Sequence, residues 1–314
     1  LNRDIFYAAI GGFGMLGCFT SLTLQLKRVY SGWIEVTALA SAHLAEMLGQ
    51  FEERLDDADY LVGWLDAFAG GRSLGRGQIH VGRHLRPGED PYPQQSLRLS
   101  HQHLPPNLFG VLPRSVMWLL MRPFMNNLGT RLVNTGKYGS SRLGHGKRYR
   151  QTHTAFHFLL DYVPDFKKAY GPGGLIQYQS FIPAAAAETA FSDILRRCQK
   201  RGLPNYLSVL KRHRPDDFLI THGLDGYSLA MDFRLTPGTR EQVAKLTAEL
   251  DEIVLAAGGR FYFAKDSTLH PDTVARYLGQ TTIDRFRTLK AQCDPLNVLQ
   301  TNLWRRLFGW SQRD

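Results

Sequence analysis

Leu175-Ile176-Gln177-Tyr178-Gln179-Ser180-Phe181-Ile182 is the stretch of sequence that decides the fold. Its β-branched and aromatic residues predict a strand. A helix is predicted directly after this strand, because four apolar residues recur there at the i, i+3, i+4, i+7 spacing of an amphipathic helix: Phe191, Ile194, Leu195 and Cys198. A strand that leads into such a helix is the start of a βα unit.

The rest of the second half continues this unit. Strands are predicted at Tyr206–Lys211, Tyr227–Leu235 and Arg260–Ala264. A second helix is predicted to begin at Thr239, in capping-box spacing with Gln242, and to stop at Gly258-Gly259; its apolar face would hold Val243, Leu246, Leu250, Ile253 and Val254. The order strand, helix, strand, strand, helix, strand is that of a split βαβ, ferredoxin-like unit.

The first half resembles most of a second copy. A helix is predicted from Leu44, Met47, Leu48 and Phe51, and strands are predicted at Trp33–Leu39, Tyr60–Phe68 and Gln78–Gly82. We therefore expect an α+β fold, in which helices cover one face of a broad antiparallel sheet. The intervening residues 87–152 are rich in Pro, Gly, Arg and Asn, and they predict a long loop around the apolar island Val116–Met125, either a lid over a site or a membrane-facing segment.

Charge and cysteine content narrow the class of partner. The chain has 314 residues and a formal net charge of +10, which favours a phosphate-bearing ligand, an anionic membrane or nucleic acid, unless the charge only keeps the chain soluble. No recognised nucleic-acid motif accompanies the charge, so we expect no nucleic-acid partner. Cys18, Cys198 and Cys293 fit neither a zinc site nor a disulfide framework; we expect no metal, and a buried thiol at Cys198.

The ends of the chain and its apolar stretches bear on its location. The sequence begins at Leu1 without a Met or a visible signal peptide, so we expect the amino terminus to be a cut. The apolar residues 108–128 make a poor membrane-spanning helix, because prolines and arginines interrupt them. We expect a cytoplasmic or peripheral membrane location.

Gly12-Phe13-Gly14-Met15-Leu16-Gly17 matches the pattern GxGxxG. A dinucleotide site needs a strand before this pattern and a helix after it, whereas the residues that follow, 18–24, alternate in the manner of a strand. The pattern therefore argues against a dinucleotide site. Its glycines would instead let the backbone pass close to another backbone segment or to a bound cofactor.

Residues 4–17 resemble the end of the flavin domain in vanillyl-alcohol-oxidase-type flavoproteins. Within that superfamily the chain is most similar to the decaprenylphosphoryl-β-D-ribose 2-oxidases. The segments that carry this resemblance are Trp64-Leu65-Asp66, Leu74-Gly75-Arg76, residues 170–179, Val209-Leu210-Lys211, Met231-Asp232-Phe233, residues 258–267, Asp294-Pro295-Leu296 and Arg305-Arg306-Leu307.

The resemblance implies the carboxyl-terminal part of an FAD-dependent oxidoreductase. Residues 1–29 would end the FAD-binding domain, residues 30–259 would form the substrate domain, and residues 260–314 would return to the FAD-binding domain. Its substrate would be a sugar hydroxyl, on a small molecule or on a polyprenyl-phosphate-linked pentose. Alternatives are an aldonolactone (D-arabinono-1,4-lactone-type) oxidase, a sterol-reductase-like flavoenzyme, or a basic phosphate- or lipid-binding module without FAD. A partner reductase and a peripheral membrane contact are further candidate partners.

Gln177 and Gln179 are the first candidate site residues. They alternate on a strand, so both face one side, and their amides can donate to and accept from a sugar hydroxyl or a flavin edge; the alternative is two solvent-facing amides. Lys265 follows a strand, and its cation would stabilise negative charge on the flavin ring; the alternative is a solvated surface charge.

The resemblance assigns the remaining site residues. Tyr262, with the segment Gly17, Cys18 and Phe19, would contact FAD. Lys211, His213 and Ser228 would line the substrate pocket. His157 stands where the family has a pocket tyrosine; it is a candidate base, since imidazole titrates near neutral pH, or a group that only hydrogen-bonds or packs. His213, Ser228 and Ala230 also replace family residues, which leaves the substrate open. The basic runs Arg142–Arg150 and Lys211–Arg214 would bind a lipid-linked phosphate or lie solvated in loops.

Overall fold

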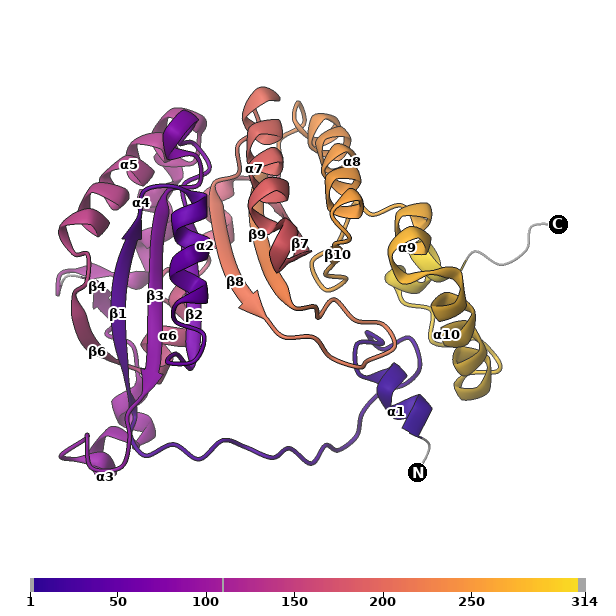
Figure 1. Cartoon of the computed structure of the whole chain (residues 1–314), viewed down its shortest axis with the longest axis horizontal. Helices are drawn as coiled ribbons and strands as arrows, with labels where there is room; N and C mark the ends of the chain where they lie inside the picture. The colour runs from indigo at the N-terminus through magenta and orange to yellow at the C-terminus, as the bar shows by residue number, and fades with distance from the viewer. Residues whose placement is uncertain (1–2, 109, 310–314) are drawn as a thin grey trace.

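The computed structural model describes residues 3–108 and 110–309. Its centre is an eight-stranded antiparallel sheet in the order β10-β7-β9-β8-β2-β3-β1-β6 (Figure 1). The strands are β1 Trp33–Ser41, β2 Tyr60–Leu65, β3 Gly77–His84, β6 Arg148–Thr152, β7 Leu175–Pro183, β8 Leu207–His213, β9 Gly226–Arg234 and β10 Arg260–Phe261. A separate hairpin pairs β4 Asn107–Leu108 with β5 Leu112–Pro113. The predicted α+β class is confirmed.

The sheet consists of two similar halves. In the second half, α7 (Ala184–Lys200) connects β7 to β8, and α8 (Arg240–Ala256) connects β9 to β10. The four strands lie side by side in the order β10-β7-β9-β8, as predicted for a split βαβ unit. In the first half, β6-β1-β3-β2 repeats this order around α2 (Leu44–Glu52). The halves meet where Gly63 of β2 pairs with Leu210 of β8.

The main core lies between the sheet and α2, α7 and α8. The four predicted apolar residues of α7 are fully buried, Cys198 among them, and burial raises the pKa of that thiol to about 12. Gly258, with φ +68°, ends α8 as predicted. The predicted capping box is wrong, because Thr239 already has helical backbone angles and its hydroxyl bonds with Thr236 instead of capping.

The prediction of helices on one face is incomplete. Gly63 of β2 faces α2, because a Cβ atom added to it would lie 3.2 Å from Sδ of Met47 in that helix. The next residue, Trp64, faces α5 (Asn127–Leu143), where Nζ of Lys137 lies 4.0 Å from the centroid of its ring. Consecutive strand side chains point to opposite faces, so α5 covers the face opposite α2. Among the described helices, α2, α7 and α8 follow the prediction.

The predicted long loop at 87–152 is also wrong in part. Besides α5 and β6, this region and the residues just after it hold α3 (Pro93–Ser96), α4 (Met117–Met121) and α6 (His153–His157). The helix α5 begins after Asn126, whose Oδ1 accepts a hydrogen bond from the amide of Gly129 at 2.9 Å.

The two ends of the described chain lie together. Asp4 of α1 (Arg3–Ala9) pairs with Arg285 of α10 (Gln280–Cys293) at 3.0 Å, beside α9 (Pro271–Leu278) and a π-helical turn at Trp304–Phe308. Residues 17–29 run as an extended trace from the α1 region toward β1 (Figure 1), without the strand that residues 18–24 suggested. The assignment of these ends to an FAD-binding domain stays a prediction. No described helix combines the length and the apolar character needed to cross a bilayer.

Candidate functional site

Polar side chains from three strands gather on the face of the sheet opposite α7 and α8. In β7, Tyr178 and Ile182 belong to the core under these helices, so Gln177 and Gln179 point the other way, and the prediction that both glutamines face one side is confirmed. The register places Gln177 opposite Asp232 of β9, Gln179 opposite Ala230, and Lys211 of β8 opposite Ser228. We call this surface the polar face.

Both glutamines are oriented by hydrogen bonds on the polar face. Nε2 of Gln177 donates to Oδ1 of Asp232 at 2.6 Å, and Nε2 of Gln179 donates to Oγ of Ser228 at 3.3 Å. Their amide oxygens have no hydrogen-bond partner among the described residues. Each amide is thus fixed through its nitrogen and offers its oxygen to the hydroxyl of a ligand.

His213 completes the group around Ser228. Its Nε2 is hydrogen-bonded to Oγ of Ser228 at 2.7 Å, and Ser228 is fully buried. Burial, together with the nearby charges of His222, Lys211 and Arg212, lowers the pKa of His213 to about 4. The imidazole is therefore neutral at neutral pH and can act as a hydrogen-bond acceptor.

Asp232 is a site residue that the sequence did not single out. It is buried, and besides Gln177 it accepts a hydrogen bond from the hydroxyl of Tyr170 at 3.3 Å. Burial raises the pKa of its carboxyl group, although the hydrogen bonds and the charge of Lys265 oppose the shift. A buried carboxyl with a perturbed pKa beside amide oxygens that have no described hydrogen-bond partner is a candidate site residue.

Tyr262 lies at the edge of the polar face, directly after β10, the strand that pairs with β7. Its ring centroid lies 4.5 Å from that of His222, a second residue that sequence reasoning missed, and 6.4 Å from that of Phe13 in the glycine-rich turn. His222 lies in the loop between β8 and β9. The sequence could have indicated it only through the general tendency of loops to carry functional residues.

The glycine-rich turn packs against this loop. A Cβ on Gly11, at φ +85°, would lie 2.4 Å from the carbonyl oxygen of Ile220, so this glycine permits a close approach of two backbones, one of the two predicted roles. The turn follows α1 and precedes an extended segment, which confirms that it is no dinucleotide-binding βα turn.

Other predicted residues lie at the margin of the polar face. Lys211 and Lys265 are exposed, and the charge of Lys265 reaches Asp232. Gly17, Cys18 and Phe19 are exposed in the extended segment, and in the part of the chain that the structure describes no hydrogen bond or ring contact joins them to Tyr262 or Lys265.

His157 belongs to a separate cluster. It ends α6, its Nδ1 donates to the carbonyl of His153 at 2.9 Å, and its ring centroid lies 4.5 Å from that of Tyr60 at the start of β2. Among described residues it contacts neither the glutamines nor Ser228. Its predicted role as a base remains a prediction.

The donor set of the polar face fits a flavin edge. A hollow beside this face, lined by residues 176–179, 261–262 and 266–269, has a cavity volume of about 10 Å³, room for roughly one water. The pyrimidine edge of a flavin carries carbonyl oxygens and an N–H. The ammonium of Lys265 has the donors that match these carbonyl oxygens, which leaves the amide oxygens of Gln177 and Gln179 for a sugar hydroxyl.

Comparisons with known proteins agree with the sequence motifs. The chain is 28% identical over 314 residues to the decaprenylphosphoryl-beta-D-ribose oxidase of Mycolicibacterium smegmatis, with 98% of this chain and 64% of that protein covered. It is 27% identical over 322 residues to an uncharacterized protein in the mprA 5′ region of Streptomyces coelicolor, with 98% and 81% covered. No family model matches the chain. The resemblance to decaprenylphosphoryl-β-D-ribose oxidases that the motifs indicated is confirmed along nearly the whole chain.

Proposed function

We propose that this chain is the substrate-binding part of an FAD-dependent oxidoreductase that oxidises a sugar hydroxyl, with a polyprenyl-phosphate-linked pentose as the leading substrate. Two findings support this: the similarity to a ribose oxidase and the polar face. The observation that carries the proposal is the pair Gln177 and Gln179, held through their nitrogens with both oxygens free.

The residues of the polar face would orient the sugar. The amide oxygens of Gln177 and Gln179 accept from two sugar hydroxyls, and the ammonium of Lys211 pairs with a phosphate. The chemistry that FAD would supply, if bound here, is acceptance of a hydride from the carbon of the oxidised alcohol. Lys265 would hold its ammonium against the negative charge that develops.

The hydroxyl proton needs an acceptor in this chain. His157 is the acceptor that the sequence suggested, and His213 is a second one that the structure favours. His213 is neutral, is hydrogen-bonded to Ser228, and belongs to the same face as the two glutamines. The variants His157→Ala and His213→Ala would show which histidine is the acceptor. Only the loss of the true acceptor should slow the reaction in a pH-dependent way.

The test is spectroscopic and uses the protein expressed from its whole coding sequence. Purified protein should show the visible absorption of bound flavin. Anaerobic addition of a polyprenylphosphoryl ribose should bleach it faster than D-arabinono-1,4-lactone does. Faster bleaching by the lactone would favour the aldonolactone oxidase. Purified protein without flavin absorption would refute the proposal and would favour the alternative of a basic binding module without FAD.

A further inference from the structure

The helix α5 is packed with its polar side inward. Its buried residues are small or polar: Gly129, Thr130, Asn134 and Ser141. Its leucines point outward, with Leu128 at 69%, Leu132 at 61% and Leu143 at 93% exposure. An amphipathic helix on a globular protein normally buries its apolar stripe, so α5 presents the opposite side to its own protein.

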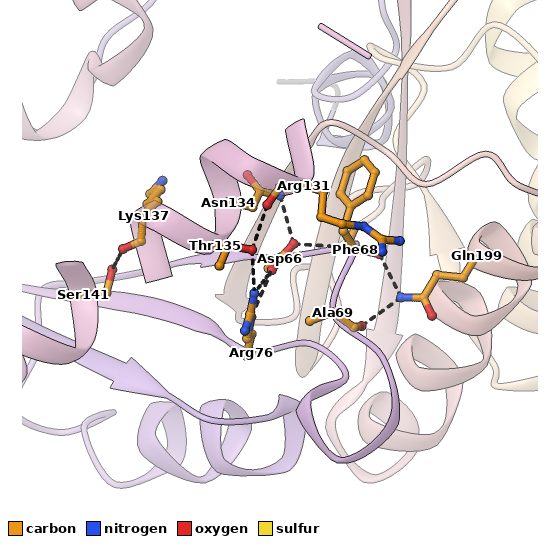
Figure 2. A network of polar contacts seen from close by, with 11 residues as sticks. Asp66, Phe68, Ala69, Arg76, Arg131, Asn134, Thr135, Lys137, Ser141 and Gln199 are labelled. Carbon is orange, nitrogen blue, oxygen red and sulfur yellow. Dashed lines mark hydrogen bonds and ion pairs between the residues drawn. The ribbon is translucent and has the colours of Figure 1, made fainter. Parts of the chain in front are cut away.

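Specific contacts fix this orientation (Figure 2). The buried carboxylate of Asp66 accepts from Nδ2 of Asn134 at 2.9 Å and from Nε of Arg76 at 3.0 Å, and Arg76 also reaches Thr135 at 3.3 Å. Lys137 adds its ammonium over the ring of Trp64. A rotation of α5 that buried its leucines would break each of these contacts. The polar contacts therefore require the leucines to face outward.

The short helices before α5 extend the apolar surface. The exposed apolar side chains of this segment are Leu119, Leu120, Phe124, Leu128, Leu132, Val133 and Leu143, which we call the α4–α5 apolar face. The turn at Phe124 packs on the first turn of α5, where the hydroxyl of Thr130 donates to the Phe124 carbonyl at 3.0 Å. Leu128 and Leu132 lie one helical turn apart on α5, and exposed apolar surface of this kind marks an interaction site.

The segment that carries this face has formal charges of one sign. Residues 91–160 contain no Asp or Glu. Their basic residues are Arg98, Arg114, Arg122, Arg131, Lys137, Arg142, Lys147, Arg148 and Arg150, nine charges of a chain whose net charge is +10. Arg122, Arg131 and Arg142 are exposed and form no ion pair with described acidic residues. The surface thus combines outward leucines with free cations.

We propose that the α4–α5 apolar face docks on an anionic lipid bilayer, with its leucines at the acyl boundary and its arginines on lipid phosphates. Nucleic acid would use the arginines and leave the leucines in water. A second copy of the chain would bring two surfaces of the same sign together. Only an anionic lipid surface suits both features.

Docking would bring the polar face to the membrane. Trp118 and Met121 of α4 pack against the buried cluster that contains Tyr170. The hydroxyl of Tyr170 donates to Asp232, which is also the hydrogen-bond partner of Gln177. A lipid-linked sugar in the bilayer would thus be presented close to the two glutamines. This consequence rests on the proposed function, whereas the docking itself does not.

Vesicle flotation tests the proposal without flavin or substrate. The chain should float with phosphatidylcholine–phosphatidylglycerol vesicles, bind pure phosphatidylcholine vesicles weakly, and lose binding as salt rises. The double variant L128E/L132E should bind the anionic vesicles at least tenfold more weakly. Leu296→Glu is the matched control, because Leu296 is 85% exposed away from this face, and it should bind like the parent.

Four results would overturn the proposal. Parent protein that does not float with anionic vesicles, or L128E/L132E that floats as the parent does, would refute docking through this face. A concentration-dependent dimer that L128E/L132E abolishes, in the absence of vesicle binding, would assign the face to a second copy. Tight binding of a duplex oligonucleotide without vesicle binding would assign it to nucleic acid. Equal thermal melting of the variant and the parent shows that both are folded.

Discussion

Asp251→Asn should change how the stability of this protein depends on pH. Asp251 of α8 is 4% exposed, and its Oδ1 accepts a hydrogen bond from the hydroxyl of Tyr178 at 2.9 Å. Burial raises the pKa of its carboxyl group from 3.8 to about 7, against the hydrogen bond of Tyr178 and with the help of Asp266 and Glu252. The folded state therefore holds a proton that the unfolded state releases, and stability is lost as pH rises from 3.8 through about 7.

The size of the effect follows from the two pKa values. Between pH 5 and pH 8 this group alone should cost the parent about 2–3 kcal/mol of unfolding free energy. Asparagine keeps the volume and an acceptor for Tyr178 but removes the titration. Urea unfolding of parent and Asp251→Asn at both pH values measures the effect, because taking the difference between pH values cancels any pH-independent cost of the amide. A pH dependence that is parallel in the two proteins would refute the reasoning.

Three further predictions concern the sheet and its surroundings. Asp66→Ala should destabilise the protein by about 3 kcal/mol, because it removes the acceptor shared by Arg76 and two other donors; a guanidinium melt that matches the parent would contradict this. The pKa of His213 falls from 6.5 to about 4 on folding, so stability should be lost as pH falls through this window, by about 3 kcal/mol at pH 4, and His213→Gln should lose less. A thiol reagent should modify exposed Cys18 quickly and Cys198 only on unfolding, and equal rates would contradict the core packing.

Seven strands of the large sheet and the helices α2, α7 and α8 of the main core could be predicted from sequence because their apolar residues face inward, whereas β6 was expected to be loop. The run Phe191, Ile194, Leu195 and Cys198 is buried in the structure, and its spacing shows it in advance. The pairing of Gln177 and Gln179 on one side follows from strand alternation in the same way.

The helix α5 escaped prediction because its pattern is reversed. Its leucines face water and its buried side is made of Gly, Thr, Asn and Ser, so apolar periodicity could not indicate a buried helix. Asp232 escaped for another reason. A carboxylate between Met231 and Phe233 is unremarkable in sequence, and only the register that sets it opposite Gln177 shows its role. Local pattern does not contain such long-range pairings.

The central claim is that Gln177 and Gln179 hold the sugar during a flavin-dependent oxidation. The most direct test is the rate of anaerobic flavin reduction by a polyprenylphosphoryl ribose in Gln177→Leu and Gln179→Leu, with Gln242→Leu on the exposed side of α8 as control. Because each glutamine would lose a hydrogen bond to the substrate, we expect both rates to fall at least about tenfold, with the flavin spectrum and the control unchanged. Parent-like reduction rates in both variants would contradict the account.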